Sequence, residues 1–163
     1  MNFNSELLFF FSALGAFNGI VLGIYIFFAA GKKHIANKFL AVAVLMLSIR
    51  AAKSVFFYFD DNLAESFVQV GIFACFFIGP FVYFYVATVC APGHRPPKWR
   101  LHLSVLLPLI VLLTLRYPYY EYRPLWSHYL LSLVYYQWVA YLILSGFIFY
   151  RSQKASLLKR NLS

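Results

Sequence analysis

The sequence predicts an all-α, polytopic membrane protein with about five transmembrane helices, folded as a single domain over residues 1–163. The first observation is composition: 63% of the residues are hydrophobic and 12% are charged, whereas soluble domains are about half apolar and about a quarter charged. The second is length, because the apolar residues gather in runs of about 20, which is what a helix needs to cross a bilayer. The third is pattern: the runs lack the alternation of barrel strands, and a span in lipid must satisfy its own backbone hydrogen bonds.

Each predicted span is one of these apolar runs, taken in chain order. The runs cover residues 7–30, 39–59, 67–90, 101–117 and 129–150. The N-terminal stretch MNFNSE carries no Lys or Arg, and the first run exceeds the apolar core of a secretory signal peptide, so we expect a retained membrane anchor. The fourth run is the shortest, and its length leaves open whether it crosses the whole bilayer.

The charges between the runs predict the orientation of the chain, because Lys and Arg collect on the cytoplasmic side of membrane proteins. One set of alternate loops, together with the tail 151–163, carries the basic residues Lys32, Lys33, Lys38, Arg95, Lys98, Arg100, Arg151, Lys154, Lys159 and Arg160. The other set carries Arg116 and Arg123, along with the acidic residues Glu6, Asp60, Asp61, Glu65 and Glu121. We therefore expect the N-terminus outside and the C-terminus in the cytoplasm, with the net charge of +9 belonging to these loops rather than to nucleic-acid contact.

The first span carries a stripe of small residues. Gly15, Gly19 and Gly23 are four residues apart and so share one helix face, where another backbone can approach closely. Asn18 lies beside this stripe near the middle of the membrane. The stripe fits packing within the chain, which is the more common use, and it also fits a dimerisation face.

The third span contains Gly79 and Pro80. Proline has no backbone N–H, so Pro80 leaves the carbonyl of Phe76 without its helical partner and should kink the helix. We interpret Gly79 and Pro80 as either a hinge or a fixed bend.

The second span carries Arg50 and Lys53 in an otherwise apolar stretch. At about 1.5 Å of rise per residue, Arg50 lies roughly 14 Å from the outer end of the span, near the midplane. A charge there costs at least about 2.5 kcal/mol. The spacing of three puts both cations on one face, yet no span contains an acidic residue.

Two interpretations of these cations stay open. In the structural one, Lys53 extends toward the outer surface and Arg50 binds neutral groups of the bundle. In the functional one, the cations bind an anionic group supplied by a ligand, such as a lipid phosphate or a fatty-acid carboxylate. The candidate ligand-binding residues are then Arg50, Lys53, Asn18 and Gln137.

Signatures of catalysis are missing from the sequence. It has no HExxH, no Cys/His zinc spacing, no GxSxG and no phosphate-binding loop. We therefore predict no enzyme, no catalytic residue, no metal site and no cofactor. Cys75 and Cys90 are expected to be free thiols that serve packing.

The stretch NKFLAVAVLMLSIRAAKS, followed by GPFVYFY, resembles the membrane half of bacterial membrane-bound AraC-type transcriptional regulators. The resemblance implies a multi-span sensor in the bacterial inner membrane that controls a cytoplasmic helix-turn-helix domain. The family continues to about seven spans and a DNA-binding domain, so this chain is expected to be either a fragment or a stand-alone relative. The matching positions are Asn37, Lys38, Phe39, Leu40, Arg50, Lys53, Ser54, Gly79, Pro80, Tyr83 and Tyr85.

The function that we predict is a non-enzymatic sensory or interaction module that binds an anionic, lipid-like ligand and signals through helix packing. Its expected partners are the bilayer and either a second copy or another membrane protein, without direct binding of nucleic acid. The alternatives are a small transporter or channel subunit and an accessory subunit of a larger membrane complex.

Overall fold

The computed structural model describes residues 3–29, 35–59, 65–90 and 99–161, and all the regular structure in these ranges is helical. The long helices are α1 (Phe3–Ala29), α2 (Ile35–Phe59), α3 (Glu65–Cys90), α4 (Trp99–Arg116) and α5 (Leu131–Asn161). A short π-helix, η1 (Leu125–Leu130), leads directly into α5. The prediction of an all-α protein is confirmed for the described residues.

Four helical segments are long and apolar enough to cross a membrane, which supports the prediction of a multi-pass membrane protein. These segments are Glu6–Ala29, Ile35–Phe57, Phe67–Cys90 and Leu125–Ala155. The predicted span at 101–117 corresponds to α4, whose apolar part, Trp99–Leu113, is shorter than the other four. The 18 residues of α4 extend over about 27 Å, slightly less than the roughly 30 Å hydrocarbon core.

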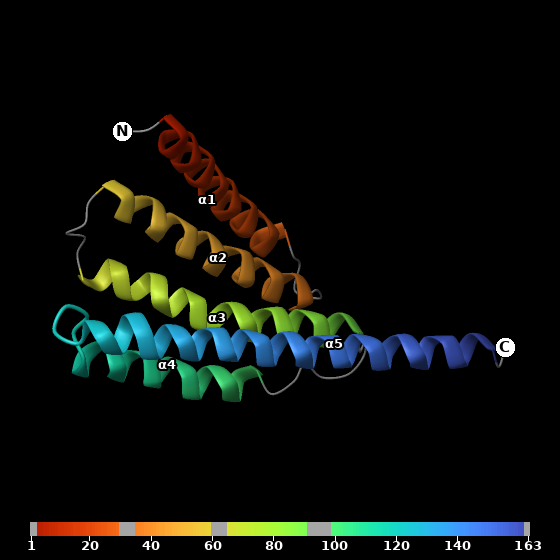
Figure 1. The fold of residues 1–163 in the computed structure, drawn as a ribbon. Helices are drawn as coiled ribbons and strands as arrows, with labels where there is room; N and C mark the ends of the chain where they lie inside the picture. The colour runs from red at the N-terminus through yellow and green to blue at the C-terminus, as the bar shows by residue number, and fades with distance from the viewer. Residues whose placement is uncertain (1–2, 30–34, 60–64, 91–98, 162–163) are drawn as a thin grey trace.

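The helices are arranged around α3 (Figure 1). α1 packs chiefly against α2, α2 against α3, and α3 against α5, while α4 makes a smaller contact with α3. Half of the apolar segment of α3 is buried, compared with 11% for the segments of α1 and α5. α3 is therefore the core helix of the bundle, and α1 stands at its edge.

Two apolar clusters hold α3 in place. The first joins α3 to α4, η1 and α5 through Ile72, Cys75, Phe76, Ile110, Trp126, Leu130 and Val134. Trp126 is fully buried, and its indole N–H donates to the Tyr117 carbonyl at 2.9 Å. The second cluster joins α2 to α3 through Phe39, Ala43, Phe81 and Phe84, and Trp99 of α4 packs edge-on against Phe39.

Three hydrogen bonds show that α3 and α5 run parallel. Gln137 bonds to Phe76, Trp138 to Cys75, and Ser152 to Cys90, with sequence separations of 61, 63 and 62 residues. A nearly constant separation means that both helices advance in the same direction. The chain between them must return through the bundle, and α4 is the helix that carries it back (Figure 1).

Candidate functional site

Lys53 lies between α2 and α3, over a glycine. A Cβ atom added to Gly71 would come within 2.6 Å of Lys53 Cγ and 2.9 Å of Cδ. The missing side chain of Gly71 therefore makes the space that the lysine stem occupies. The Lys53 ammonium lies 5.0 Å from the centroid of the Phe57 ring, a cation–π contact that partly replaces lost hydration.

Arg50 lies one helical turn before Ser54 and donates an Nη1 hydrogen bond to the Ser54 hydroxyl. It is also an electrostatic neighbour of Lys53 and of the Cys75 thiol. That thiol donates to the Gly71 carbonyl at 3.3 Å. α2 and α3 thus bring together the residues that we call the cationic cluster: Arg50, Lys53, Gly71 and Cys75.

The charge of the cationic cluster is not balanced within the described part of the chain. Among the described side chains, no carboxylate acts on Lys53, whose charged neighbour is Arg50. Arg50 and Lys53 are both only half-buried, so a ligand can approach them. A guanidinium presents a planar fork of N–H donors, and an ammonium presents a compact charge, and both groups favour carboxylate or phosphate oxygens.

Gln137 binds the carbonyl that Pro80 leaves free. Its Nε2 donates to the Phe76 carbonyl at 3.2 Å, the group whose helical donor the proline lacks. The neighbouring Trp138 donates its indole N–H to the Cys75 carbonyl at 2.8 Å. The structure therefore uses Gln137 to join α5 to α3, and the Oε1 atom of Gln137 is buried without a partner among the described residues.

Asn18 is placed away from the cationic cluster. It is exposed on α1, whereas Gly19 and Gly23 of the same helix face α2. A Cβ on Gly19 would lie 3.3 Å from Ser48 Cβ, and one on Gly23 would lie 2.6 Å from Leu45 Cγ. Gly15 is different, because a Cβ there would meet nothing within 4 Å. Two glycines of the stripe thus serve packing within the chain.

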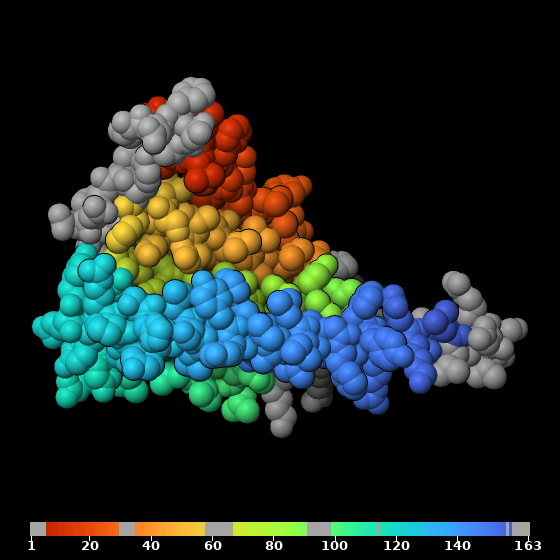
Figure 2. Space-filling view, viewed as in Figure 1, coloured from red at the N-terminus to blue at the C-terminus, as the bar shows by residue number. Residues whose placement is uncertain are grey.

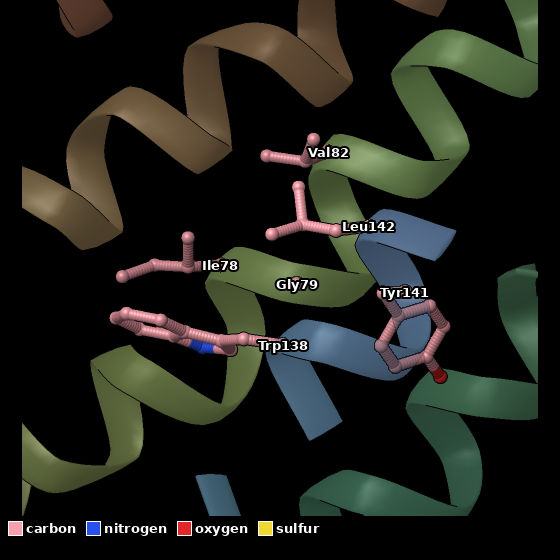
Figure 3. Close-up of a pocket in the computed structure, with 6 residues that line it drawn as sticks. All are labelled: Ile78, Gly79, Val82, Trp138, Tyr141 and Leu142. Atoms are coloured by element: carbon pink, nitrogen blue, oxygen red, sulfur yellow. The ribbon is translucent and has the colours of Figure 1, made fainter. Parts of the chain in front are cut away.

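Gly79 lies beside an apolar hollow between α3 and α5 (Figure 3). A Cβ on Gly79 would come within 3.2 Å of the Tyr141 ring and 3.3 Å of the Trp138 ring, so the glycine admits both rings. α3 continues as a helix through Gly79 and Pro80. The hollow has a volume of about 90 Å³ and is lined by Ile78, Gly79, Val82, Trp138, Tyr141 and Leu142.

Sequence reasoning missed two residues that shape this region, Gly71 and Trp138. Gly71 and Cys75 lie one turn apart in an apolar run, and only the position of Lys53 on the neighbouring helix reveals why the first is a glycine. Trp138 was not singled out, although a tryptophan in the middle of a span needs a partner for its indole N–H. That signal identifies the residue without identifying its acceptor.

Comparisons with known proteins give no relative for this chain. No protein-family model, no curated protein and no solved structure matches it. The likeness to AraC-type regulators therefore rests on the sequence motifs, and the arrangement of the described helices carries the functional argument.

Proposed function

We propose that this chain is a non-enzymatic sensory or interaction module of the bacterial inner membrane that binds an anionic amphiphile at Arg50 and Lys53. The observation that carries the proposal is the cationic cluster, in which two cations share the interface of α2 and α3 without a carboxylate among the described side chains. A charge in the hydrocarbon core is costly and usually has a partner or a functional role. A ligand that brings its own carboxylate or phosphate would supply that partner.

The proposed topology has five spans, with the N-terminus outside and the C-terminus in the cytoplasm. Its support is the parallel course of α3 and α5, since α4 must return the chain between them. The basic residues Lys38 and Arg151 lie at the end of the bundle where α2 begins and α5 leaves it (Figure 1). The positive-inside rule assigns that end to the cytoplasm.

The proposed signal is a change in helix packing around α3. Lys53 rests on α3 at Gly71, and α5 is hydrogen-bonded to the same helix at Cys75 and Phe76. A ligand that draws Arg50 and Lys53 away from α3 would thus loosen the contact at Gly71. This contact lies one turn before Cys75, where α5 is hydrogen-bonded to α3. α5 continues past its bond to Cys90 as far as Asn161, so its far end can pass this change to a cytoplasmic partner. The resemblance to AraC-type regulators is consistent with such a sensor.

The test is ligand binding by the whole chain in phosphatidylcholine proteoliposomes. Palmitate and phosphatidic acid are the two probes, methyl palmitate is the uncharged control, and tryptophan fluorescence is the readout because Trp138 is bonded to Cys75. We expect at least about tenfold weaker binding for Arg50→Gln, in line with the loss of a charge-assisted hydrogen bond. Arg50→Lys should retain part of the affinity, which separates loss of charge from loss of fold.

Arg116→Gln is the matched control, because Arg116 is exposed at the end of α4 and stacks over Tyr117. Equal binding by Arg50→Gln and the unmodified chain would refute the proposed site. Binding of palmitate alone identifies a fatty acid as the ligand class, whereas binding of phosphatidic acid alone identifies a phospholipid. Anion flux into the vesicles that requires Arg50 would overturn the sensor in favour of a transporter.

A further inference from the structure

Asn18 presents an exposed carboxamide at the middle of the outermost helix. The apolar segment of α1 runs from Glu6 to Ala29, so Asn18 lies at its midpoint. The side chain is exposed and forms no hydrogen bond with the described residues. Hydrocarbon offers an amide no partner, so a carboxamide at this depth is strongly driven to find one.

The face of α1 that carries Asn18 is opposite the face that packs against α2. Ala16 is 5% exposed, and Gly19 and Gly23 meet α2 side chains on that inner face. The outer face follows alternating steps of three and four residues, the spacing of a coiled-coil seam. Its members, which we call the α1 seam, are all exposed: Phe11, Leu14, Asn18, Val21, Tyr25 and Phe28.

We propose that two copies of this chain pair through the α1 seam, with the two Asn18 side chains bonded to each other. Copies with the same loop charges insert in the same orientation, so their first helices are parallel and Asn18 meets Asn18 at equal depth. A carboxamide is both donor and acceptor, and a two-fold axis lets each side chain satisfy the other. In parallel coiled coils, a single Asn in the seam specifies a dimer and fixes its register.

The position of α1 leaves the α1 seam accessible to a second copy. Figure 2 shows α1 standing at the edge of the molecule, with α2 beneath it. The α1 seam is separate from the cationic cluster between α2 and α3, and dimerisation and anion binding can therefore fail independently.

The first test measures self-association of the full chain by energy transfer between labelled copies in phosphatidylcholine proteoliposomes, diluted with lipid. An interhelical hydrogen bond in a membrane predicts that Asn18→Leu raises the dissociation constant about 3- to 30-fold. Asn18→Gln keeps the carboxamide and should retain dimerisation. The proposal would be overturned if the unmodified chain stayed monomeric or if the Asn18→Leu variant associated equally well. Lipid or another protein would then cover the α1 seam.

The second test locates the contact by oxidative cross-linking. Tyr25 and Ile24 are adjacent and exposed, at 68% and 46%, but consecutive helix residues point about 100° apart, and only Tyr25 belongs to the α1 seam. We expect Tyr25→Cys to form a disulfide-linked dimer and Ile24→Cys to give no more than the background of the natural Cys75 and Cys90. Equal cross-linking at both positions, or none at Tyr25→Cys, would contradict the seam.

Discussion

At the scale of single residues, Gly71 decides whether Lys53 fits between α2 and α3. The lysine stem occupies the space of a missing side chain, with Cγ 2.6 Å from where a Cβ would be. Gly71→Ala forces this stem, or the helix pair, to shift. Overpacking of this kind costs about 1–3 kcal/mol, and thermal unfolding in detergent should show the corresponding loss of stability.

Gly146→Ala is the matched control for this prediction. Gly146 lies within α5, and a Cβ there would meet nothing within 4 Å. Both substitutions gain the same roughly 1 kcal/mol of helix propensity, so the difference between the two variants isolates the contact with Lys53. Equal melting temperatures for the two variants would show that Lys53 moves aside at no cost.

At the scale of elements, the parallel pair α3–α5 depends on a backbone carbonyl of α3 that lacks its helical donor. A side chain of α5 donates to this carbonyl instead. Pro80 cannot donate to the Phe76 carbonyl, and Gln137 donates to it instead at 3.2 Å. Gln137→Leu should therefore lower the free energy of unfolding by about 0.6–1.7 kcal/mol, the average and the maximum for side-chain hydrogen bonds between membrane helices. Pro80→Ala restores a helical donor to the same carbonyl.

The two substitutions together form a double-mutant cycle. In the Pro80→Ala background, Phe76 no longer needs Gln137, so the loss caused by Gln137→Leu should shrink toward zero. Unfolding measured in mixed micelles gives the four free energies. Additive effects would mean that Gln137 stabilises the pair through packing rather than through the freed carbonyl.

Sequence reasoning predicted the elements better than their roles. Apolar runs, Pro80 and the mid-span polar residues are visible in the chain, but the bond between Gln137 and Phe76 joins residues 61 apart and is not. The segments of α1 and α3 have mean hydropathies of 2.1 and 2.0, yet 11% of the first and 50% of the second are buried. Lipid is as apolar as a helix interface, so hydropathy does not distinguish a core helix from an edge helix.

At the scale of the whole molecule, the direction of α5 determines the number of crossings. α3 and α5 are parallel, and the helix between them is the short α4. If α4 crosses, the segment between α4 and η1 lies on the side opposite to the basic end of α5. If α4 stays on the cytoplasmic side and α5 still crosses, that segment lies in the cytoplasm and the basic end of α5 lies outside. The 18 residues of α4 are enough for a crossing where flanking side chains reach the surface, as Arg100 and Arg116 can.

Cysteine labelling of intact cells distinguishes these two topologies. Glu121→Cys lies after α4, and Lys154→Cys lies in the last turns of α5; both side chains are exposed. We expect a membrane-impermeant maleimide to label Glu121→Cys in intact cells and to label Lys154→Cys only after permeabilisation, with the unmodified chain as the background for Cys75 and Cys90. Protection of Glu121→Cys in intact cells would refute the crossing of α4. The parallel bonds between α3 and α5 would then require one of those two helices to leave the membrane, which their apolar segments of 24 and 31 residues oppose.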